Sequence, residues 1–477
     1  MVSAMRKVDV CVRGAGAAGR VSTSGAAQLG LETARIEAGE MGGDCLNTGC
    51  VPSKAILAAA HAAHEAKGSQ PHGVTGVEVP AVDFGAVLHH IRGAIKAIHP
   101  KDSQERFEGL GAHVIRHKAR FTSPRTVEVN GETIHFKRAV IATGSQPFVP
   151  PIDGLADTPF LTNETLWALE ELPTHLVIIG GGAIGCEMAQ AFRRLGAQVT
   201  VFEQGNLLGR VDPAATEVLR QRLIQEGVVL HETTTVTKVT HPQEGAFSLV
   251  YEKDGTQGEG TASHLLVAAG RVVTTDALNL SAAGVEVDAK GIRVDQSLKT
   301  TNKRIFAVGD CNGQYQLTHA AGHEGGQFIK AGVLKLPGAI SRAGMPHVTY
   351  TDPEIAQVGM TEAQAREVHG DSILVFSEDF AENDRAVAEG KTEGFAKVIL
   401  KSNGQVLGAT IAGAHAGELI HLWSLAISKR LKPGGLSGFI APYPTYGEIN
   451  KALINKYFQD KLFSPTVRFV VKLLNLW

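Results

Sequence analysis

The chain has little cysteine, no long apolar run and no excess of charge of either sign. Only 5 of its 477 residues are cysteine, which excludes a fold held together by a framework of disulfide bonds. No apolar segment approaches the roughly 20 residues of a membrane-spanning helix, and the first residues lack the apolar core of a secretory signal. The 46 basic and 48 acidic residues give a net charge of −2, which predicts no nucleic-acid partner. We therefore expect a cytoplasmic, globular protein of two to four domains.

Two of the cysteines, Cys45 and Cys50, lie close together between a glycine pair and a proline. On an ideal helix, residues five apart are separated by about 7.5 Å along the axis, beyond the roughly 7 Å between Cα atoms that a disulfide can bridge. A disulfide here needs a distorted backbone, which Asn47 and Gly49 permit. Strained disulfides are the reducible ones, so the pair indicates redox chemistry; two buried thiols that never meet are the alternative. The remaining cysteines are interpreted as small buried side chains: Cys11, Cys186 and Cys311.

A pattern of strand, glycine-rich loop, helix and strand occurs twice. The first copy has a strand at 9–12, a helix to residue 29 and a strand at 32–36; the second has a strand at 176–179, a helix at 186–195 and a strand at 198–202. The loop glycines are Gly14, Gly16 and Gly19 in the first copy and Gly180, Gly182 and Gly185 in the second. An acidic residue ends the second strand of each copy, Glu37 and Glu203, 23 positions after the first glycine (14 to 37, 180 to 203).

This spacing is the fingerprint of a dinucleotide site, in which the glycines admit a pyrophosphate and the acid binds ribose hydroxyls. Two copies predict two dinucleotides and electron transfer between them. Because the cysteine pair directly follows the first copy, we expect a flavin there, since a flavin can mediate between a hydride carrier and sulfur. In the second copy, the carboxylate of Glu203 would oppose a 2′-phosphate, which favours NADH over NADPH; Arg210, nearby in sequence, keeps NADPH as an alternative.

Residues 42–54 closely resemble the redox-active disulfide motif of the class I flavoprotein (pyridine nucleotide) disulfide oxidoreductases, the family of mercuric reductase, dihydrolipoamide dehydrogenase and glutathione reductase. The resemblance implies FAD in the first dinucleotide unit and a nicotinamide cofactor in the second. It implies that Cys50 faces the flavin as a thiolate, that Cys45 exchanges with the substrate and that Lys54 lies beside the flavin. Further cofactor-binding positions are carried over from matching segments: Gly43, Thr143, Gly144, Gly270 and Asp310.

The resemblance spans almost the whole chain and implies an α/β fold with two Rossmann-like dinucleotide-binding domains and an α+β C-terminal dimerisation domain. We expect the FAD domain at residues 1–155 and 281–344, the NAD(P) domain at 156–280 and the dimerisation domain at 345–477. The family implies a homodimer whose active site is shared between subunits.

One departure from the family concerns the acid/base residue. Members that act on thiols carry His-Pro-Thr-x-x-Glu near the C-terminus, whereas Tyr443 stands here in place of the histidine and Glu448 remains. Histidine titrates near 6.5 and tyrosine near 10, so an unperturbed phenol is about three pKa units too weak an acid to exchange protons at neutral pH. Mercuric reductases also have a tyrosine there, although no cysteine follows Cys311 to supply their C-terminal pair.

These observations predict an enzyme that passes electrons from NAD(P)H through FAD and the cysteine pair to a metal ion, a quinone or a thiol/disulfide acceptor, similar to mercuric reductase. A dihydrolipoyl dehydrogenase is the first alternative, and a weakly active, membrane-associated flavoprotein subunit is the second. His319 and His323 match ordinary family sequence, so no metal site is predicted.

Two further features have no counterpart in the family pattern. Arg13 precedes the first glycine and Arg20 follows the third; we hypothesise that one of them reaches the FAD phosphates, and the alternative is that both extend to the surface. At the C-terminus, residues 463–477 are apolar with Arg468 and Lys472 among them. That segment predicts either weak contact with a membrane surface or packing within the dimer.

Overall fold

The computed structural model describes residues 5–67, 73–74, 81–243 and 245–475. The chain divides into two units, the first formed by Met1–Ile179, Thr237–Val250 and Glu259–Ile340 and the second by Gly180–Val236, Tyr251–Gly258 and Ser341–Trp477. These units are not the three predicted domains, whose boundaries stay a prediction.

A mixed sheet forms the centre of the first unit, with the strand order β3-β2-β1-β6-β5-β4 and β18 added beside β6. The strands are β1 (Met5–Arg13), β2 (Thr33–Glu37), β3 (Ala112–Arg116), β4 (Ala119–Ser123), β5 (Thr126–Val129), β6 (Glu132–Ile141) and β18 (Ile305–Ala307). β1 pairs in parallel with both β2 and β6, while β4, β5 and β6 form an antiparallel meander. A parallel core with crossover helices is the doubly wound arrangement that binds dinucleotides.

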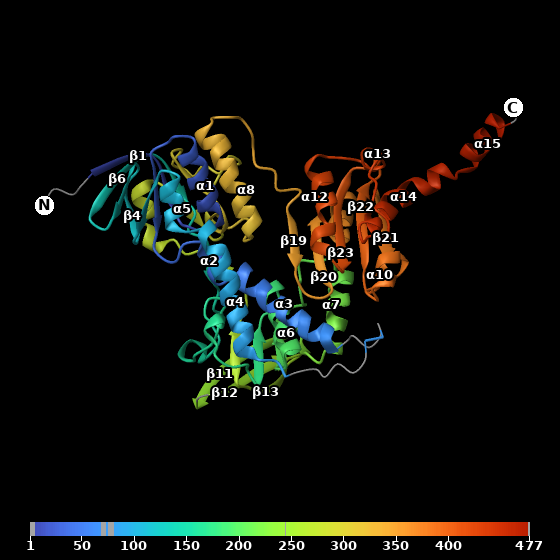
Figure 1. Ribbon diagram of the computed structural model, residues 1–477, viewed down its shortest axis with the longest axis horizontal. Helices are drawn as coiled ribbons and strands as arrows, with labels where there is room; N and C mark the ends of the chain where they lie inside the picture. Colours follow the sequence, from blue (N-terminus) through green and yellow to red (C-terminus); the bar gives the residue numbers. More distant parts are fainter. Residues whose placement is uncertain (1–4, 68–72, 75–80, 244, 476–477) are drawn as a thin grey trace. The chain divides into compact units, whose positions relative to one another are not determined.

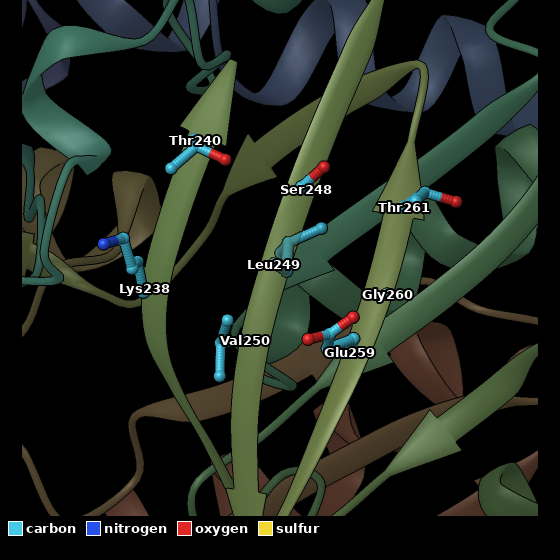
Figure 2. A pocket seen from close by; sticks show the side chains of 8 residues that line it. All are labelled: Lys238, Thr240, Ser248, Leu249, Val250, Glu259, Gly260 and Thr261. Carbon is cyan, nitrogen blue, oxygen red and sulfur yellow. The ribbon is translucent and has the colours of Figure 1, made fainter. Parts of the chain in front are cut away.

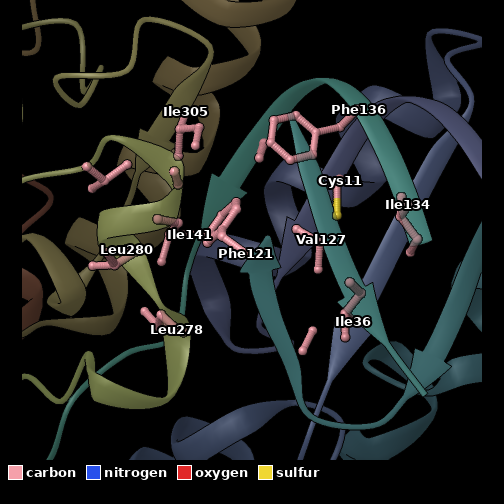
Figure 3. Close-up of a cluster of buried hydrophobic side chains, with 14 of the residues drawn as sticks. Cys11, Ile36, Phe121, Val127, Ile134, Phe136, Ile141, Leu278, Leu280 and Ile305 are labelled. Carbon is pink, nitrogen blue, oxygen red and sulfur yellow. The ribbon is translucent and has the colours of Figure 1, made fainter. Parts of the chain in front are cut away.

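The apolar side chains of this sheet face two separate cores. On one face Cys11 packs with Ile36, Phe121 and Phe136, and Figure 3 shows the meander closing over them. On the other face Val10 and Val12 pack against α1 (Ala17–Gln28) and α8 (Thr318–Phe328), which lie side by side in Figure 1. The side chains of consecutive residues in β1 therefore pack into the cores on opposite faces of the sheet, as expected for a strand buried on both faces.

Helices α2 (Gly43–Asn47), α3 (Cys50–Lys67), α4 (Phe84–Ile98) and α5 (Gln104–Gly109) complete the first unit around the cysteine segment. In α4, the buried side chains recur at helical spacing, at Phe84, Val87, Leu88 and Ile91. Asp83 caps this helix by accepting a hydrogen bond from the Ala86 backbone N–H at 3.0 Å. The short strands of the unit are β7 (Gln146–Pro147), β8 (His175–Ile179), β14 (His264–Val267), β15 (Arg271–Val272), β16 (Val287–Asp288) and β17 (Gly291–Ile292).

The second unit contains the second glycine loop and an antiparallel sheet. Around the loop lie α6 (Ala183–Leu195), β9 (Gln198–Phe202), α7 (Pro213–Gln225) and β10 (Val229–His231). The sheet has the order β19-β20-β23-β22-β21, from β19 (Pro346–Thr349), β20 (Glu354–Gly359), β21 (Ile373–Asp379), β22 (Phe395–Lys401) and β23 (Val406–Gly413). Shorter helices of this unit are α9 (Glu362–His369), α10 (Asp384–Ala388), α11 (Ala416–Leu419) and α13 (Pro433–Leu436).

Helices α12 (His421–Ser428) and α14 (Glu448–Leu462) bury one face of this sheet. Trp423 lies in that core at 1% exposure, and its indole N–H donates to the Asn450 side-chain oxygen at 2.7 Å. The chain then continues into α15 (Pro465–Leu474). Within the described ranges, no helix combines the length and apolar character needed to cross a membrane.

Candidate active site

The first glycine loop leaves the N-terminus of α1 open to a ligand. Gly14 has φ +115°, and a Cβ there would lie 2.1 Å from the Ala142 carbonyl oxygen, so only glycine fits. Gly19 is equally restricted, because its Cβ would lie 2.0 Å from the Gly14 oxygen. At Gly16, the N-cap of α1, a Cβ would meet nothing within 4 Å, and no side chain caps the helix. The backbone N–H groups there are available to an anion.

The second loop repeats this geometry. Gly180 has φ +114°, and Gly182, the N-cap of α6, has φ −74° and ψ −173° against −71° and −170° at Gly16. Gly180 donates its backbone N–H to the Phe202 oxygen at 2.8 Å, as Gly14 does to the Ile36 oxygen at 2.9 Å. The two loops therefore share the same backbone geometry.

The acidic residue of each copy accepts hydrogen bonds from the backbone of its own glycine loop. Glu37 accepts the backbone N–H of Ala15 at 2.5 Å and of Gly39 at 2.7 Å. Glu203 accepts that of Gly181 at 2.6 Å and of Gly205 at 2.8 Å. Both carboxylates thus lie at the loop, where the sequence places a ribose-binding acid.

The remaining cofactor-binding positions carried over from the family also lie in the first unit, and their geometry is compatible with a bound cofactor. Gly43 packs against the first loop, since a Cβ there would lie 2.8 Å from the Gly16 Cα. The Thr143 hydroxyl is buried without a hydrogen-bond partner among the described residues, as expected of a group that forms its hydrogen bond with a bound ligand. Gly144 and Gly270 have φ values of +72° and +123° and open space around them.

Asp310 belongs to a polar network that the sequence did not reveal. It accepts the Ser145 hydroxyl at 2.7 Å, and burial raises the pKa of its carboxyl. Arg271 donates to the Ser145 hydroxyl at 2.7 Å and forms an ion pair with Asp44 at 3.0 Å. Strand pairing places Arg271 opposite Pro147 in the β15–β7 ribbon, so this loop is ordered although Val272 and Val273 depart from the family pattern. The network links the residue before Cys45 to the predicted FAD-binding aspartate.

The cysteine pair lies across a break between two helices. Cys45 is in α2, and α3 begins at Cys50, with Thr48 and Gly49 between them. Asn47 stays helical, and its side-chain amide donates to the Met41 and Gly43 carbonyls at 3.0 and 2.8 Å. The distortion expected of a bridgeable pair is therefore present, at Thr48 and Gly49. In this structure no disulfide bond joins the two sulfurs.

The two thiols have opposite acidities. A hydrogen bond from Cys45 lowers the pKa of Cys50, with further contributions from the Thr318 hydroxyl at 3.1 Å and the charge of Lys54, one helical turn away. The same hydrogen bond and burial raise the pKa of Cys45. Cys50 also begins a helix, where a thiolate is favoured. These contacts favour Cys50 as the thiolate and Cys45 as the thiol that keeps its proton.

The other three cysteines are small buried side chains, as predicted. Cys11, Cys186 and Cys311 are at most 2% exposed, and burial raises the pKa of each thiol. Among the described residues, no group of three or more histidine, cysteine or acidic side chains is arranged to hold a metal ion.

The structure places the two arginines near the first loop in different surroundings, and which of them reaches the FAD phosphates stays a prediction. Arg20 forms an ion pair with Asp102 at 3.0 Å, a partner that neither sequence hypothesis included. Arg13 keeps one buried guanidinium nitrogen without a partner in the described part of the chain, and burial lowers its pKa to about 10. No sequence pattern indicated a role for Arg35, which is 0% exposed, donates to the Ala15 carbonyl at 2.7 Å and lies 3.9 Å above the Phe107 ring.

The predicted C-terminal site residues lie in the second unit. Tyr443 is 72% exposed, and its hydroxyl donates to the Asp384 carboxylate at 3.0 Å. That hydrogen bond raises the pKa of the phenol above 10. Glu448 begins α14 and accepts the Thr445 backbone N–H at 3.3 Å. Asp384 and Glu448 share the lining of a hollow of about 230 Å³ whose other carboxylates are Glu378 and Glu382.

A larger hollow of about 380 Å³ has none of these residues in its lining. Figure 2 shows it on the strands β11 (Thr234–Gln243), β12 (Ala246–Lys253) and β13 (Thr256–Ala262), with Lys238 and Glu259 as its charged side chains. No cysteine, glycine loop or predicted site residue contributes to it, so it is not the redox site.

Comparisons with known proteins match this geometry. Residues 8–325 match the family model "Pyridine nucleotide-disulphide oxidoreductase", and residues 345–453 match its dimerisation domain. A mercuric reductase from Acidithiobacillus ferrooxidans is 34% identical over 467 residues, which cover 95% of this chain and 83% of that protein. A dihydrolipoyl dehydrogenase from Bacillus subtilis (strain 168) is also 34% identical, over 93% of this chain and 95% of its own.

Among solved structures, the HOCl-induced flavoprotein disulfide reductase RclA from Escherichia coli has a TM-score of 0.81 and 27% identity, covering 94% of this chain and 99% of its own. A Cu(II) complex of the same protein has a TM-score of 0.82.

Proposed function

Because the chain belongs to the pyridine nucleotide-disulphide oxidoreductases, enzymes that use FAD and NAD(P)H, we propose that it reduces a soft metal ion at Cys45 and Cys50. When bound, FAD supplies the two-electron chemistry that connects a nicotinamide hydride to sulfur. With Hg(II) as acceptor, NADH and Hg(II) give NAD⁺, Hg(0) and one proton. The family's dimerisation domain makes the protein a homodimer.

The observation that carries the proposal is the hydrogen bond from Tyr443 to Asp384. A phenol that donates to a carboxylate is a weaker acid than free tyrosine, so it is poorly suited to take and return a proton at neutral pH. Dithiol oxidation requires such proton transfers. Reduction of a metal ion held by two sulfurs requires none from this residue, and the family implies that Tyr443 of the partner subunit faces the cysteines.

Local charge also favours a cation. Four carboxylates and one lysine, Lys451, line the hollow beside Tyr443, so its net charge is negative and it repels anionic acceptors such as glutathione disulfide. Thiolates are the preferred ligands of soft metal ions, and a Cys50 thiolate offers the first bond without losing a proton. Two of the relatives are consistent with this choice, since one is named a mercuric reductase and another was solved with Cu(II).

We propose NADH as the electron donor. The Glu203 carboxylate lies at the second loop, where it would repel the 2′-phosphate of NADPH. Steady-state rates with each nucleotide test this, and a higher kcat/KM with NADPH contradicts it.

A screen of NADH oxidation by the purified protein tests the acceptor. Hg(II) and Cu(II) should support turnover, whereas oxidised lipoamide, glutathione disulfide and a quinone should support little. The variant Tyr443→His should gain lipoamide reduction, because imidazole titrates near neutral pH. Tyr446→Phe is the matched control: Tyr446 also donates to a carboxylate, Glu389 at 2.8 Å, but lies in the core, so acceptor choice should not change.

A dihydrolipoyl dehydrogenase is the second candidate, supported by a relative of equal identity. It predicts rapid lipoamide reduction by the unchanged protein, which would overturn the metal-ion proposal. A weakly active flavoprotein subunit, the remaining alternative, predicts that NADH fails to bleach the bound flavin.

A further inference from the structure

The last helix of the described chain carries an apolar surface that its own unit leaves uncovered. α15 runs from Pro465 to Leu474 and contains no buried residue. The large apolar side chains of this arm, residues 462–474, are between 44% and 71% exposed: Leu462, Phe463, Phe469, Val470, Val471, Leu473 and Leu474. We propose that the arm packs against the dimerisation domain of a second copy of this chain.

The arm is a separate helix with its own start signals. The Ser464 hydroxyl accepts the Val467 backbone N–H at 3.4 Å, and Pro465 occupies the first helical turn. A single helix of 10 residues is marginal in water unless an apolar face is packed. A capped helix at this position therefore indicates that another protein surface packs against its apolar face.

The apolar surface extends around more than half of the helix. At 3.6 residues per turn, Phe469 and Leu473 form one row, and Val470 and Leu474 form the next. With the valines at 467 and 471, the apolar arc reaches about 200°, and only the row of Arg468 and Lys472 is charged. A helix that lies on a membrane has a strongly charged face rich in basic residues. A helix that is apolar on most sides is either surrounded by protein or spans a membrane, and the 10 residues of α15 are about half of what a span requires.

The arm is continuous with the part of the chain that dimerises. The dimerisation match ends at residue 453, within α14. The first half of α14 is covered by its own sheet, because Ile449, Leu453 and Ile454 are each 1% exposed. The end of the helix is more exposed than its start, since Leu462 is 57% exposed. Figure 1 shows α14 leaving the sheet and α15 extending beyond it.

In a two-fold symmetric dimer, both arms can be covered without any further partner. In an isologous dimer each arm docks on the other subunit, so the buried area counts twice. The seven side chains offer roughly 500 Å² per arm, or about 1,000 Å² for the pair, the size at which a contact becomes specific.

A photo-crosslinking experiment identifies the surface that covers the arm. The holoenzyme carries p-benzoylphenylalanine in place of Phe469, on the apolar arc, or in place of Arg468 as the control on the charged row. Heterodimers of isotopically light and heavy chains distinguish a bond between chains from one within a chain. Crosslinks between two chains, with partner peptides from residues 345–453 and several-fold stronger from 469 than from 468, support the proposal. Crosslinks confined to one chain, or none, overturn it.

A substitution pair gives the second measurement. Phe469→Ser with Leu473→Ser should weaken dimerisation at least tenfold in sedimentation over a dilution series, because four large apolar side chains leave the interface. Arg468→Ser with Lys472→Ser, on the same helix, should change it less than threefold. Neither pair touches the redox site, so FAD content and bleaching by NADH report that each variant is folded.

Vesicles of phosphatidylcholine and phosphatidylserine test the competing occupant. We expect that the full chain does not sediment with them. If it does, and the double serine variant loses that binding while its dimer affinity stays unchanged, the arm binds lipid and the proposal is wrong.

Discussion

Replacing Thr318 by valine should raise the pKa of Cys50 without altering the fold. The Thr318 hydroxyl lies 3.1 Å from the Cys50 sulfur and can donate a hydrogen bond to the thiolate. Valine has nearly the same shape but cannot donate. Since Thr318 is the first residue of α8 and is half-buried, the change removes one hydrogen bond and little packing.

The size of the effect follows from the charge on the sulfur. A hydrogen bond to a charged group contributes about 1.5–3 kcal/mol, and one pKa unit corresponds to about 1.4 kcal/mol. The pKa of Cys50, about 6 in the unchanged protein, should therefore rise by about 1 to 2 units. At pH 7 the thiolate would fall from most of the population to half or less.

The assay is the rate of alkylation of Cys50 by iodoacetamide in the NADH-reduced protein, followed by peptide mass spectrometry across a pH series. Only the thiolate reacts, so the rate rises with pH through the pKa. The half-maximal rate should lie near pH 6 for the unchanged protein and for Thr318→Ser, and 1 to 2 units higher for Thr318→Val. A valine variant that titrates together with the unchanged protein would refute the reasoning, and Cys11, with a pKa of about 12, should stay unmodified throughout.

Two further substitutions test the loop and the second unit. Gly16→Ala should fold normally, because the added methyl group meets no protein atom, but it should lose most of its FAD, because that methyl group occupies the approach to the pyrophosphate. Gly19→Ala should instead destabilise the fold, because its methyl group clashes with the Gly14 oxygen. FAD content and urea denaturation separate the two effects, and full FAD binding by Gly16→Ala would contradict the assigned role. Arg194→Met should cost about 3–5 kcal/mol of unfolding free energy, since it removes a buried guanidinium that forms ion pairs with the carboxylates of Glu226 and Asp352. The exposed pair of Arg366 and Glu362 is the control, with less than about 1 kcal/mol expected for Arg366→Ala in the same denaturation experiment.

Features set by short stretches of sequence were predictable. The two glycine loops and their acidic residues follow a local pattern, and the structure gives both the same backbone angles. The first strand was predicted at 9–12 but begins at Met5, because its polar start pairs with β6 through backbone hydrogen bonds that need no apolar side chain.

Features set by distant segments were not predictable. Thr318 reaches Cys50 across 268 positions, and Arg271 reaches Asp44 from a loop whose sequence departs from the family pattern. The burial of Arg35 depends on Phe107 and on the Ala15 carbonyl, which the topology brings together. A single sequence carries no signal for such contacts, whereas the replacement of histidine by Tyr443 was visible in a short motif.

The unequal acidity of the two thiols also determines how the driving force of the reaction responds to pH. Above about pH 6, reduction of the pair takes up two electrons and only one proton, because Cys50 stays a thiolate. The midpoint potential of the pair then falls by about 30 mV per pH unit. The nicotinamide couple also exchanges one proton per two electrons and changes by the same amount. Electron transfer from NADH to the cysteine pair therefore has a driving force that is independent of pH above about 6, and becomes more favourable in acid, where the pair takes up a second proton.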